Sequence, residues 1–281
     1  MAKLHNYNGR YCETEYENAF LSFLEEAGWS YLPGSSLPRT SMRDVLYVDD
    51  MEYFLNKTNP DLTADEIQQI MDTVRLAGAE SDFATLHKVY GWMVNGIQFT
   101  PQSGLPIMVN LIDFENPEKN VFRAVNQFIV EYTNNGQTEN RRPDILLFVN
   151  GIPLCIVELK NPADGNATIY GAWEQSNLRY WRDIPHLLHY CPLACISDGV
   201  KTRLGTVRTP YEHFYAWRRV NDGDKVSPLP FDEVQTMIKG VYSPKRFLEI
   251  FRDYIYFRTA SMTVRNGRSS AGTRNFLPLV C

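Results

Sequence analysis

The chain has 281 residues, of which 44% are hydrophobic and 22% charged. This composition excludes a disordered chain and can bury one large core with a smaller lobe. The net charge of −5 does not indicate a nucleic-acid-binding protein, but basic residues can still cluster locally. No stretch resembles a signal peptide or reaches the roughly 18 apolar residues of a membrane-spanning helix, so we expect a soluble cytoplasmic protein without membrane contact.

Helical patterns dominate the first third of the chain. Residues 13–27 carry apolar side chains at helical spacing, and Gly28 follows as a natural stop. Further along, Thr63 and Glu66 have the spacing of a capping box, which marks the start of another helix. We therefore expect a mainly helical lobe over residues 44–95.

The pattern changes to strands after residue 96. The stretches 96–100, 105–114 and 124–133 are β-branched and aromatic, with turn residues between them. Two apolar runs flanking Asn150-Gly151 predict a hairpin, and residues 166–185 return to a helical pattern. The expected architecture is an α/β fold, in which helices flank a mixed sheet and a helical lobe precedes it.

Register decides what this hairpin can do. With a bare two-residue turn at Asn150 and Gly151, Asp144 and Glu158 would point to opposite faces of the sheet. One extra residue would bring the two carboxylates opposite each other, about 4.5–5.5 Å apart at Cβ. Pro153 cannot donate to the ladder, so we expect an irregular turn that absorbs the extra residue near it.

Lys160 lies two residues after Glu158 and shares its face by strand alternation. Two carboxylates and an ammonium group suit Mg²⁺ or Mn²⁺ and a phosphate, which indicates metal-assisted phosphodiester hydrolysis with Asp144 as the second ligand. A structural ion pair is the alternative that these residues leave open.

The stretch "RPDILLFVNGIPLCIVELKNP" resembles the nuclease motif of the R (restriction) subunit of type I restriction-modification enzymes. That motif belongs to the PD-(D/E)xK, RecB-like nuclease superfamily. The resemblance extends to "ENAFLSFLEEAGWSYLPG", "NLIDFENPEKNVFRAVNQFIVEY" and "YWRDIPHLLHYCPLACISDGVKTRLGT". It implies a PD-(D/E)xK restriction-endonuclease-like fold over residues 1–258, which act as an endonuclease domain.

By matching positions, the resemblance implies that Asp144 and Glu158 are metal ligands and Lys160 is the catalytic lysine. Glu17 matches an acidic helix position that can bind metal; its alternative role is a charge that suits the helix N-terminus. The family's Gln-x-x-x-Tyr motif contacts DNA, but here Gln175 lies five residues before Tyr180 instead of four. A π-bulge or a shifted helix start would let both residues keep that role.

The resemblance also implies partners and cofactors. These are duplex DNA, the methyltransferase (M) and specificity (S) subunits, Mg²⁺ with Mn²⁺ as a substitute, and ATP, which motor domains of the complete subunit consume. No G-x-x-x-x-G-K-[ST] motif occurs in this sequence. One alternative is a truncated module that binds DNA or the methyltransferase without cleaving, and another is a stand-alone nuclease of the resolvase kind.

Residues 259–281 match the preceding domain poorly and predict an irregular tail. In the family, an Arg-Tyr-Pro-Gln-Phe-like segment leads into the motor domains. Residues 271–276 can be encoded so that a one-base change of frame yields that segment. Our hypothesis is that the gene is frameshifted shortly after Phe257.

Overall fold

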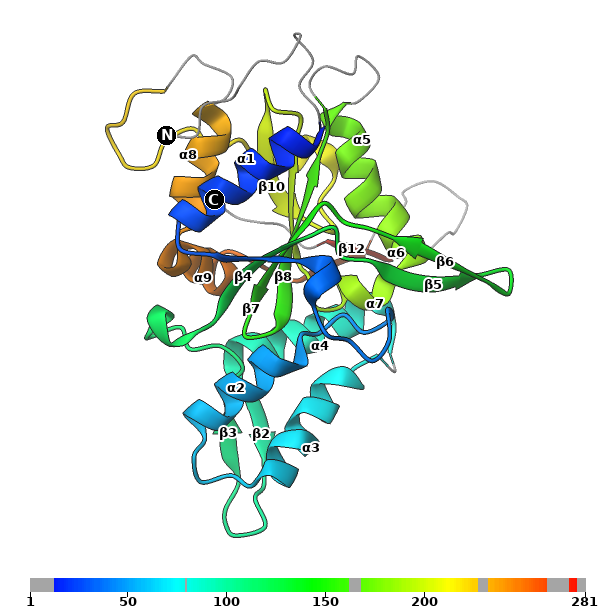
Figure 1. Ribbon diagram of the computed structural model, residues 1–281, viewed down its shortest axis with the longest axis vertical. Helices are drawn as coiled ribbons and strands as arrows, with labels where there is room; N and C mark the ends of the chain where they lie inside the picture. The colour runs from blue at the N-terminus through cyan, green and yellow to red at the C-terminus, as the bar shows by residue number, and fades with distance from the viewer. Residues whose placement is uncertain (1–12, 79, 162–167, 227–231, 262–272, 277–281) are drawn as a thin grey trace.

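A computed structural model describes residues 13–78, 80–161, 168–226, 232–261 and 273–276. A six-stranded mixed sheet forms the centre, in the order β1-β4-β7-β8-β9-β10 (Figure 1). Its strands are β1 (Ser30–Pro33), β4 (Phe122–Asn126), β7 (Ile145–Val149), β8 (Ile152–Leu159), β9 (Leu193–Ser197) and β10 (Thr202–Thr206). The expected α/β class with a mixed sheet flanked by helices is confirmed.

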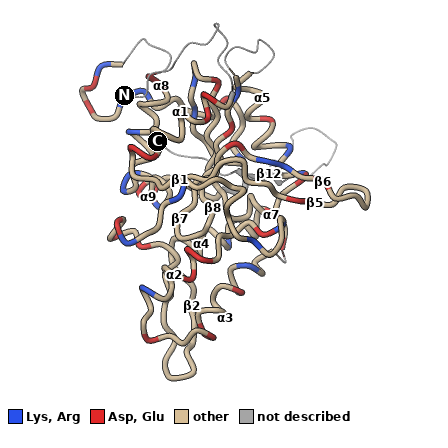
Figure 2. The backbone as a smooth tube through the Cα atoms, in the orientation of Figure 1, with Lys and Arg blue, Asp and Glu red and all other residues tan. Residues whose placement is uncertain are grey.

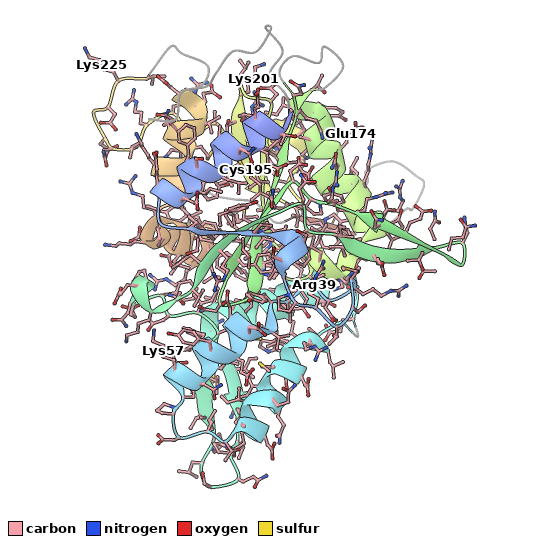
Figure 3. All side chains as sticks on the ribbon, in the orientation of Figure 1. Arg39, Lys57, Glu174, Cys195, Lys201 and Lys225 are labelled. Atoms are coloured by element: carbon pink, nitrogen blue, oxygen red, sulfur yellow. The ribbon has the colours of Figure 1, made fainter. Side chains whose placement is uncertain are left out.

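Strands β7 and β8 lie at the centre of this sheet, and all their residues are buried. β7 pairs with β8 in antiparallel fashion, whereas β8 pairs with β9 in parallel. Burial on both faces explains why these strands are continuous apolar runs instead of alternating ones. Helix α1 (Glu13–Glu26) and helix α5 (Ile169–Glu174) both pack against β8. Figure 3 shows Cys195 within this core, whereas Lys201 and Lys225 lie at its outside.

The expected helical lobe is present below the sheet in Figure 1. It contains α2 (Val48–Thr58), α3 (Ala64–Arg75), α4 (Asp82–Asn95) and the small antiparallel pair β2 (Ile97–Phe99) and β3 (Ile107–Val109). The capping box at the start of α3 is confirmed, since the side chains of Thr63 and Glu66 each accept the other residue's backbone N–H.

The lobe holds the turn of the β7–β8 hairpin. The backbone N–H of Tyr47 donates to the Gly151 carbonyl at 2.8 Å. Gly151 has φ +76°, and a Cβ added to it would collide with the Tyr47 carbonyl, so this position requires glycine. The side chain of buried Asn150 accepts from Val121 N–H and donates to the Leu111 carbonyl, at 2.8 and 2.9 Å.

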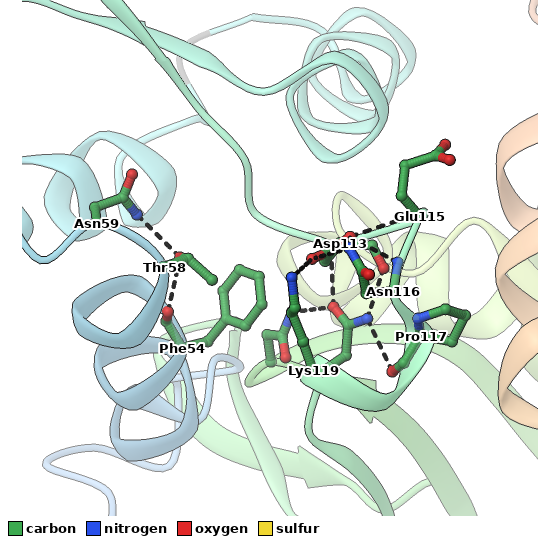
Figure 4. Close-up of polar contacts among 10 residues, drawn as sticks. Phe54, Thr58, Asn59, Asp113, Glu115, Asn116, Pro117 and Lys119 are labelled. Carbon is green, nitrogen blue, oxygen red and sulfur yellow. Dashed lines mark hydrogen bonds and ion pairs between the residues drawn. The ribbon is translucent and has the colours of Figure 1, made fainter.

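The loop before β4 is itself cross-linked by polar contacts (Figure 4). Asp113 accepts from the backbone N–H of Asn116, and Asn120 donates to the carbonyls of Asp113 and Pro117. Asn120 also accepts from Asn150 at 2.8 Å. The turn end of the hairpin is therefore fixed, while its other end carries Asp144 and Glu158.

The hairpin register corrects one expectation. Asn150 and Gly151 do form a bare two-residue turn, because Val149 pairs with Ile152 and both turn residues have positive φ. The extra residue is Leu154, which is bulged out between the Phe148–Pro153 pair and the next one. An irregularity near Pro153 is thus confirmed, but it lies within the strand and not in the turn.

The remaining elements cover the sheet and its edge. Helices α8 (Asp232–Val241) and α9 (Pro244–Asp253) follow the sheet, with α8 against α1 and β10. In the tail that was expected to be irregular, β11 (Arg258–Ser261) pairs with β12 (Thr273–Phe276); its other residues lie outside the described ones. None of the helices in the described part of the chain is long and apolar enough to cross a membrane.

Candidate active site

The bulge places Asp144 and Glu158 side by side. Ile145 pairs with Val157, so the same register continued by one residue sets Asp144 opposite Glu158. The backbone N–H of Leu159 donates to Asp144 Oδ2 at 2.7 Å, which orients the Asp144 carboxylate toward the end of β8. The register that the sequence required for a shared cation is therefore the register that is observed.

Glu158 is the most unusual carboxyl group of this site. The residue is fully buried, and Tyr180 Oη donates to its Oε1 at 2.8 Å. Its other oxygen, Oε2, is buried, and no N–H or hydroxyl group of the described residues donates to the ionised carboxylate there; when Glu158 is protonated, the neighbouring Asp144 carboxylate can accept from it. Burial, reinforced by the neighbouring charge of Asp144, raises the pKa of Glu158 well above its ordinary value. A buried oxygen without a donor costs free energy, so this side chain lowers the stability of the folded protein.

Lys160 joins the same group through a directed chain of hydrogen bonds. Lys160 Nζ donates to Gln175 Oε1 at 3.0 Å, and Gln175 Nε2 donates to Tyr180 Oη at 2.8 Å. Tyr180 in turn donates to Glu158, so the chain of hydrogen bonds runs in one direction from Lys160 to Glu158. Tyr180 is buried, which raises the pKa of its hydroxyl well above the ordinary value and keeps it a donor.

A π-helix makes this chain possible. After α5, residues Gln175–Arg179 form one π-helical turn, closed by a bond from the Tyr180 N–H to the Gln175 carbonyl; α6 (Tyr180–Asp183) follows. The wider turn brings residues five apart onto one side, so the side chains of Gln175 and Tyr180 meet. The π-bulge is confirmed. Both side chains are directed toward Glu158 and Lys160. Contact of these two residues with DNA stays a prediction.

Glu17 lies on α1 and is also buried. Asn126 Nδ2 donates to its Oε1 at 2.6 Å, and Gln127 Nε2 donates to its Oε2 at 2.5 Å. Gln127 has φ +51°, and its backbone N–H donates to the carbonyl of Asp144 at 2.9 Å. Glu17 therefore holds the chain beside Asp144. Among the described residues no three His, Cys, Asp or Glu side chains converge on one metal position, so its role as a ligand stays a prediction.

Sequence reasoning missed the support on the other side of Lys160. The Lys160 backbone N–H donates to the Ser197 carbonyl at 2.8 Å, and Ser197 Oγ lies 2.6 Å from Tyr16 Oη. Tyr16 belongs to the apolar stripe of α1, and nothing in that pattern indicates that its hydroxyl anchors the end of β9. Only the parallel pairing of β8 with β9 brings Ser197 to this place.

The residues present fit a divalent cation. Asp144 and Glu158 supply carboxylate oxygens on one face, and the Glu158 oxygen that lacks a donor is the kind of atom that a hard cation satisfies. Mg²⁺ is usually bound through one or two carboxylates and keeps several water molecules, so two ligands suffice.

Comparison with known proteins decides the family. The family model described as type I restriction enzyme R protein N terminus matches residues 10–213, a range that includes every residue of the site. The chain belongs to this family.

Its relatives are much longer proteins. The chain is 31% identical over 265 residues to the type I restriction enzyme HindI endonuclease subunit of Haemophilus influenzae, covering 89% of this chain and 24% of the relative. It is also 31% identical over 264 residues to a provisional type I restriction enzyme endonuclease subunit, MjaIXP, of Methanocaldococcus jannaschii, covering 85% and 25%. The chain therefore spans about a quarter of the length of these endonuclease subunits.

Proposed function

We propose that this chain is the Mg²⁺-dependent endonuclease domain of a type I restriction enzyme R subunit and hydrolyses phosphodiester bonds of duplex DNA. The observation that supports this most directly is the convergence of Asp144, Glu158 and Lys160 at one end of the hairpin, with a buried Glu158 oxygen that lacks a donor. Membership of the family and the fold are consistent with the proposal.

Each residue has a defined part in this proposal. Asp144 and Glu158 hold the cation, and Tyr180 fixes the orientation of Glu158 through its hydroxyl. Lys160 uses one N–H on Gln175, which leaves two donors for a phosphate oxygen or the attacking water. Glu17 acts indirectly, because Asn126 and Gln127 bind it and Gln127 contacts the Asp144 backbone. When bound, the cation would polarise the phosphate and lower the pKa of a water molecule.

The larger assembly is part of the same proposal. The chain would act with methyltransferase and specificity subunits, and ATP would be consumed by motor domains of the complete subunit. Cleavage would then follow translocation along DNA, and the complex would be cytoplasmic. These statements rest on the family and on the names of relatives that are about four times longer.

Nicking of a supercoiled plasmid by this chain in Mg²⁺ tests the proposal. We expect Asp144→Asn and Lys160→Gln to reduce the rate by about 100-fold or more, as loss of a principal electrostatic group does in other enzymes. Glu52→Gln and Lys57→Gln are matched controls, because both residues are exposed on α2. Equal rates for the site variants and the controls would contradict the proposal.

One outcome would favour the second candidate. A chain that binds Mn²⁺ and duplex DNA but does not nick it, alone or with M and S subunits and ATP, would be a non-cleaving binding module. Nicking without partners or ATP, by contrast, would indicate a nuclease that acts alone.

A further inference from the structure

A two-stranded hairpin projects from the core directly beside the candidate site. It consists of β5 (Val130–Asn134) and β6 (Gln137–Arg141) and extends away from the central sheet (Figure 1). Only Arg142 and Pro143 separate its second strand from Asp144. Whatever contacts the base of this hairpin therefore lies close to the proposed cation ligands.

The base of the hairpin is joined to α6 by a shared carboxylate. Arg141 Nε and Nη2 each lie 2.7 Å from Asp183 Oδ2, and Arg182 Nε lies 2.7 Å from Oδ1. The Asp183 side chain is only 5% exposed, whereas that of Arg182 is 69% exposed. The two arginines lower the pKa of Asp183, which remains ionised and fixes both guanidinium groups.

Two further arginines extend this surface. Arg142 and Arg179 are exposed, and neither forms an ion pair with the residues that the structure describes. Arg179 precedes Arg182 by three positions, which places the two on one side of the helix. We call Arg141, Arg142, Arg179 and Arg182 the arginine collar. Figure 2 shows basic segments where the hairpin meets the core.

The collar keeps an excess of positive charge. The carboxylates that act on Arg182 are Asp183 and Glu139, and Glu139 already accepts from Tyr132 Oη and Asn134 Nδ2 at 2.6 and 2.8 Å. The four guanidinium groups therefore exceed these two carboxylates by two positive charges, although the whole chain has a net charge of −5. Exposed guanidinium groups gain little from surface ion pairs, but they bind phosphates well.

The hairpin tip has a different but compatible chemistry. Residues 133–138 are all exposed and read Thr-Asn-Asn-Gly-Gln-Thr, without a charged or large apolar side chain. Such a tip lacks the apolar surface of a protein-binding hot spot and is not repelled by phosphates. A two-stranded ribbon of this kind fits the major groove of duplex DNA.

We propose that the arginine collar binds backbone phosphates of duplex DNA and that the β5–β6 hairpin lies along the adjacent groove, which positions a phosphodiester at Asp144 and Glu158. This inference rests on the proposed function, because it names the surface by which the same site receives its substrate. The collar positions the backbone and reads no sequence.

The salt dependence of DNA binding tests the collar. We compare the wild-type chain with the triple variant Arg142→Gln, Arg179→Gln, Arg182→Gln, and leave Arg141 in place because it joins the hairpin to α6. Each lost phosphate contact should reduce the slope of log K against log salt by about 0.9, so a reduction of about 2–3 is expected. Mn²⁺ affinity should be unchanged.

A matched control triple is Lys57→Gln, Lys225→Gln, Lys245→Gln, which removes the same charge from exposed positions elsewhere. Figure 3 places Lys57 on the helical lobe and Lys225 on the loop near α8, both away from α5. This control should leave the slope within about 0.5 of the wild type, because it removes no phosphate contact.

A second variant tests the hairpin itself. Gln137→Glu with Thr138→Glu adds two negative charges to the exposed tip and should weaken duplex binding by about tenfold or more through repulsion from phosphates. The thermal stability should not change, because both side chains are exposed and outside the core.

The outcomes separate this inference from the proposed function. An unchanged salt slope in the collar triple overturns the inference, even when the wild type binds Mn²⁺ and cleaves DNA. Loss of binding to methyltransferase or specificity subunits, with DNA binding unchanged, also overturns it and assigns the surface to a protein partner. If instead Glu158→Gln binds Mn²⁺ as tightly as the wild type, the proposed function is contradicted. This holds whatever salt slope the collar triple shows.

Discussion

Glu66 in the helical lobe and Glu158 in the central sheet are both buried, yet their surroundings differ completely. Glu66 accepts from the Thr63 backbone N–H, the Thr63 hydroxyl and the Gln102 N–H, all within 2.9 Å. These hydrogen bonds lower the pKa of Glu66. Among the described residues Glu158 receives a single donor, from Tyr180, and burial raises its pKa well above the ordinary value.

On our proposal, this difference separates a structural carboxylate, Glu66, from a cation ligand, Glu158. A buried carboxylate normally finds donors for both oxygens, as Glu66 does. The second oxygen of Glu158 has none among the described residues, and Asp144 adds a second carboxylate next to it. Such an arrangement destabilises a fold unless a cation occupies it, and costs of this kind concentrate at functional sites.

Among substitutions outside the two proposed cation ligands, the largest expected effect comes from removing the donor that Glu158 has among the described residues. Tyr180→Phe deletes the hydroxyl that orients Glu158 and accepts from Gln175, so Mn²⁺ affinity should fall by about 10- to 100-fold, as for other residues that orient metal ligands. Thr63→Val removes a donor to Glu66 in the same way and should leave Mn²⁺ affinity unchanged. Isothermal titration calorimetry measures the Mn²⁺ affinity of both variants. Equal losses of affinity in the two variants would contradict the proposed difference between Glu158 and Glu66.

Thermal stability should change in opposite directions at the two glutamates. Glu158→Gln replaces a carboxyl oxygen that has no donor among the described residues with an amide N–H beside the Asp144 carboxylate, so it should stabilise the metal-free protein by about 1–3 kcal/mol. Glu66→Gln should lower the melting temperature, because an amide cannot accept on both sides as the carboxylate does. Calorimetry without divalent cations checks the signs, and a lower melting temperature for Glu158→Gln would contradict the account.

The loss of folding stability at acid pH should depend on Glu66. Its folded pKa is lowered below the ordinary value of 4.5, so its stabilisation is present above that pH and is lost as the pH falls below it. The wild type should therefore lose its higher free energy of unfolding, relative to Glu66→Gln, between about pH 5 and pH 3. His186, whose burial lowers its pKa to about 4, titrates in both proteins and cancels in the comparison. A difference that is independent of pH would show that the hydrogen bonds do not shift the pKa.

Deletion of Leu178 should have the smallest effect. Leu178 is 52% exposed within the π-helix, and its removal leaves Gln175 four residues before the tyrosine, as an ordinary α-helix requires. Mn²⁺ affinity should stay within about threefold of the wild type, because the side chains still meet. Deletion of Asn177, which donates to the carbonyls of Thr206 and Thr209, should lower stability instead. A large loss of affinity on deleting Leu178 would show that the π-turn itself is needed.

Much of this site follows from local patterns. The two apolar runs around Asn150-Gly151 predicted the hairpin, and strand alternation predicted that Lys160 shares a face with Glu158. The five-residue spacing of Gln175 and Tyr180 left a π-bulge or a shifted helix start as alternatives, and the π-bulge is present. Each of these predictions needed only residues that are close in sequence.

Other features depend on distant parts of the chain. The bulge falls at Leu154 and not in the turn, because the helical lobe holds Gly151 and the loop before β4 holds Asn150 in place. The anchoring of Glu17 by Asn126 and Gln127 joins residues more than 100 positions apart. The Glu158 oxygen that lacks a donor is likewise invisible in the sequence, since it results from everything packed around it.

Direct titration with Mn²⁺ tests the central claim, that Asp144 and Glu158 form a divalent cation site. We expect the wild-type chain and Glu66→Gln to bind Mn²⁺ with equal affinity in competition with Mg²⁺. Asp144→Asn and Glu158→Gln should each reduce that affinity by about 100-fold or more, because each replaces one of the two proposed carboxylate ligands with a neutral amide. Wild-type affinity in Glu158→Gln would contradict the account, since the cation would then lie elsewhere.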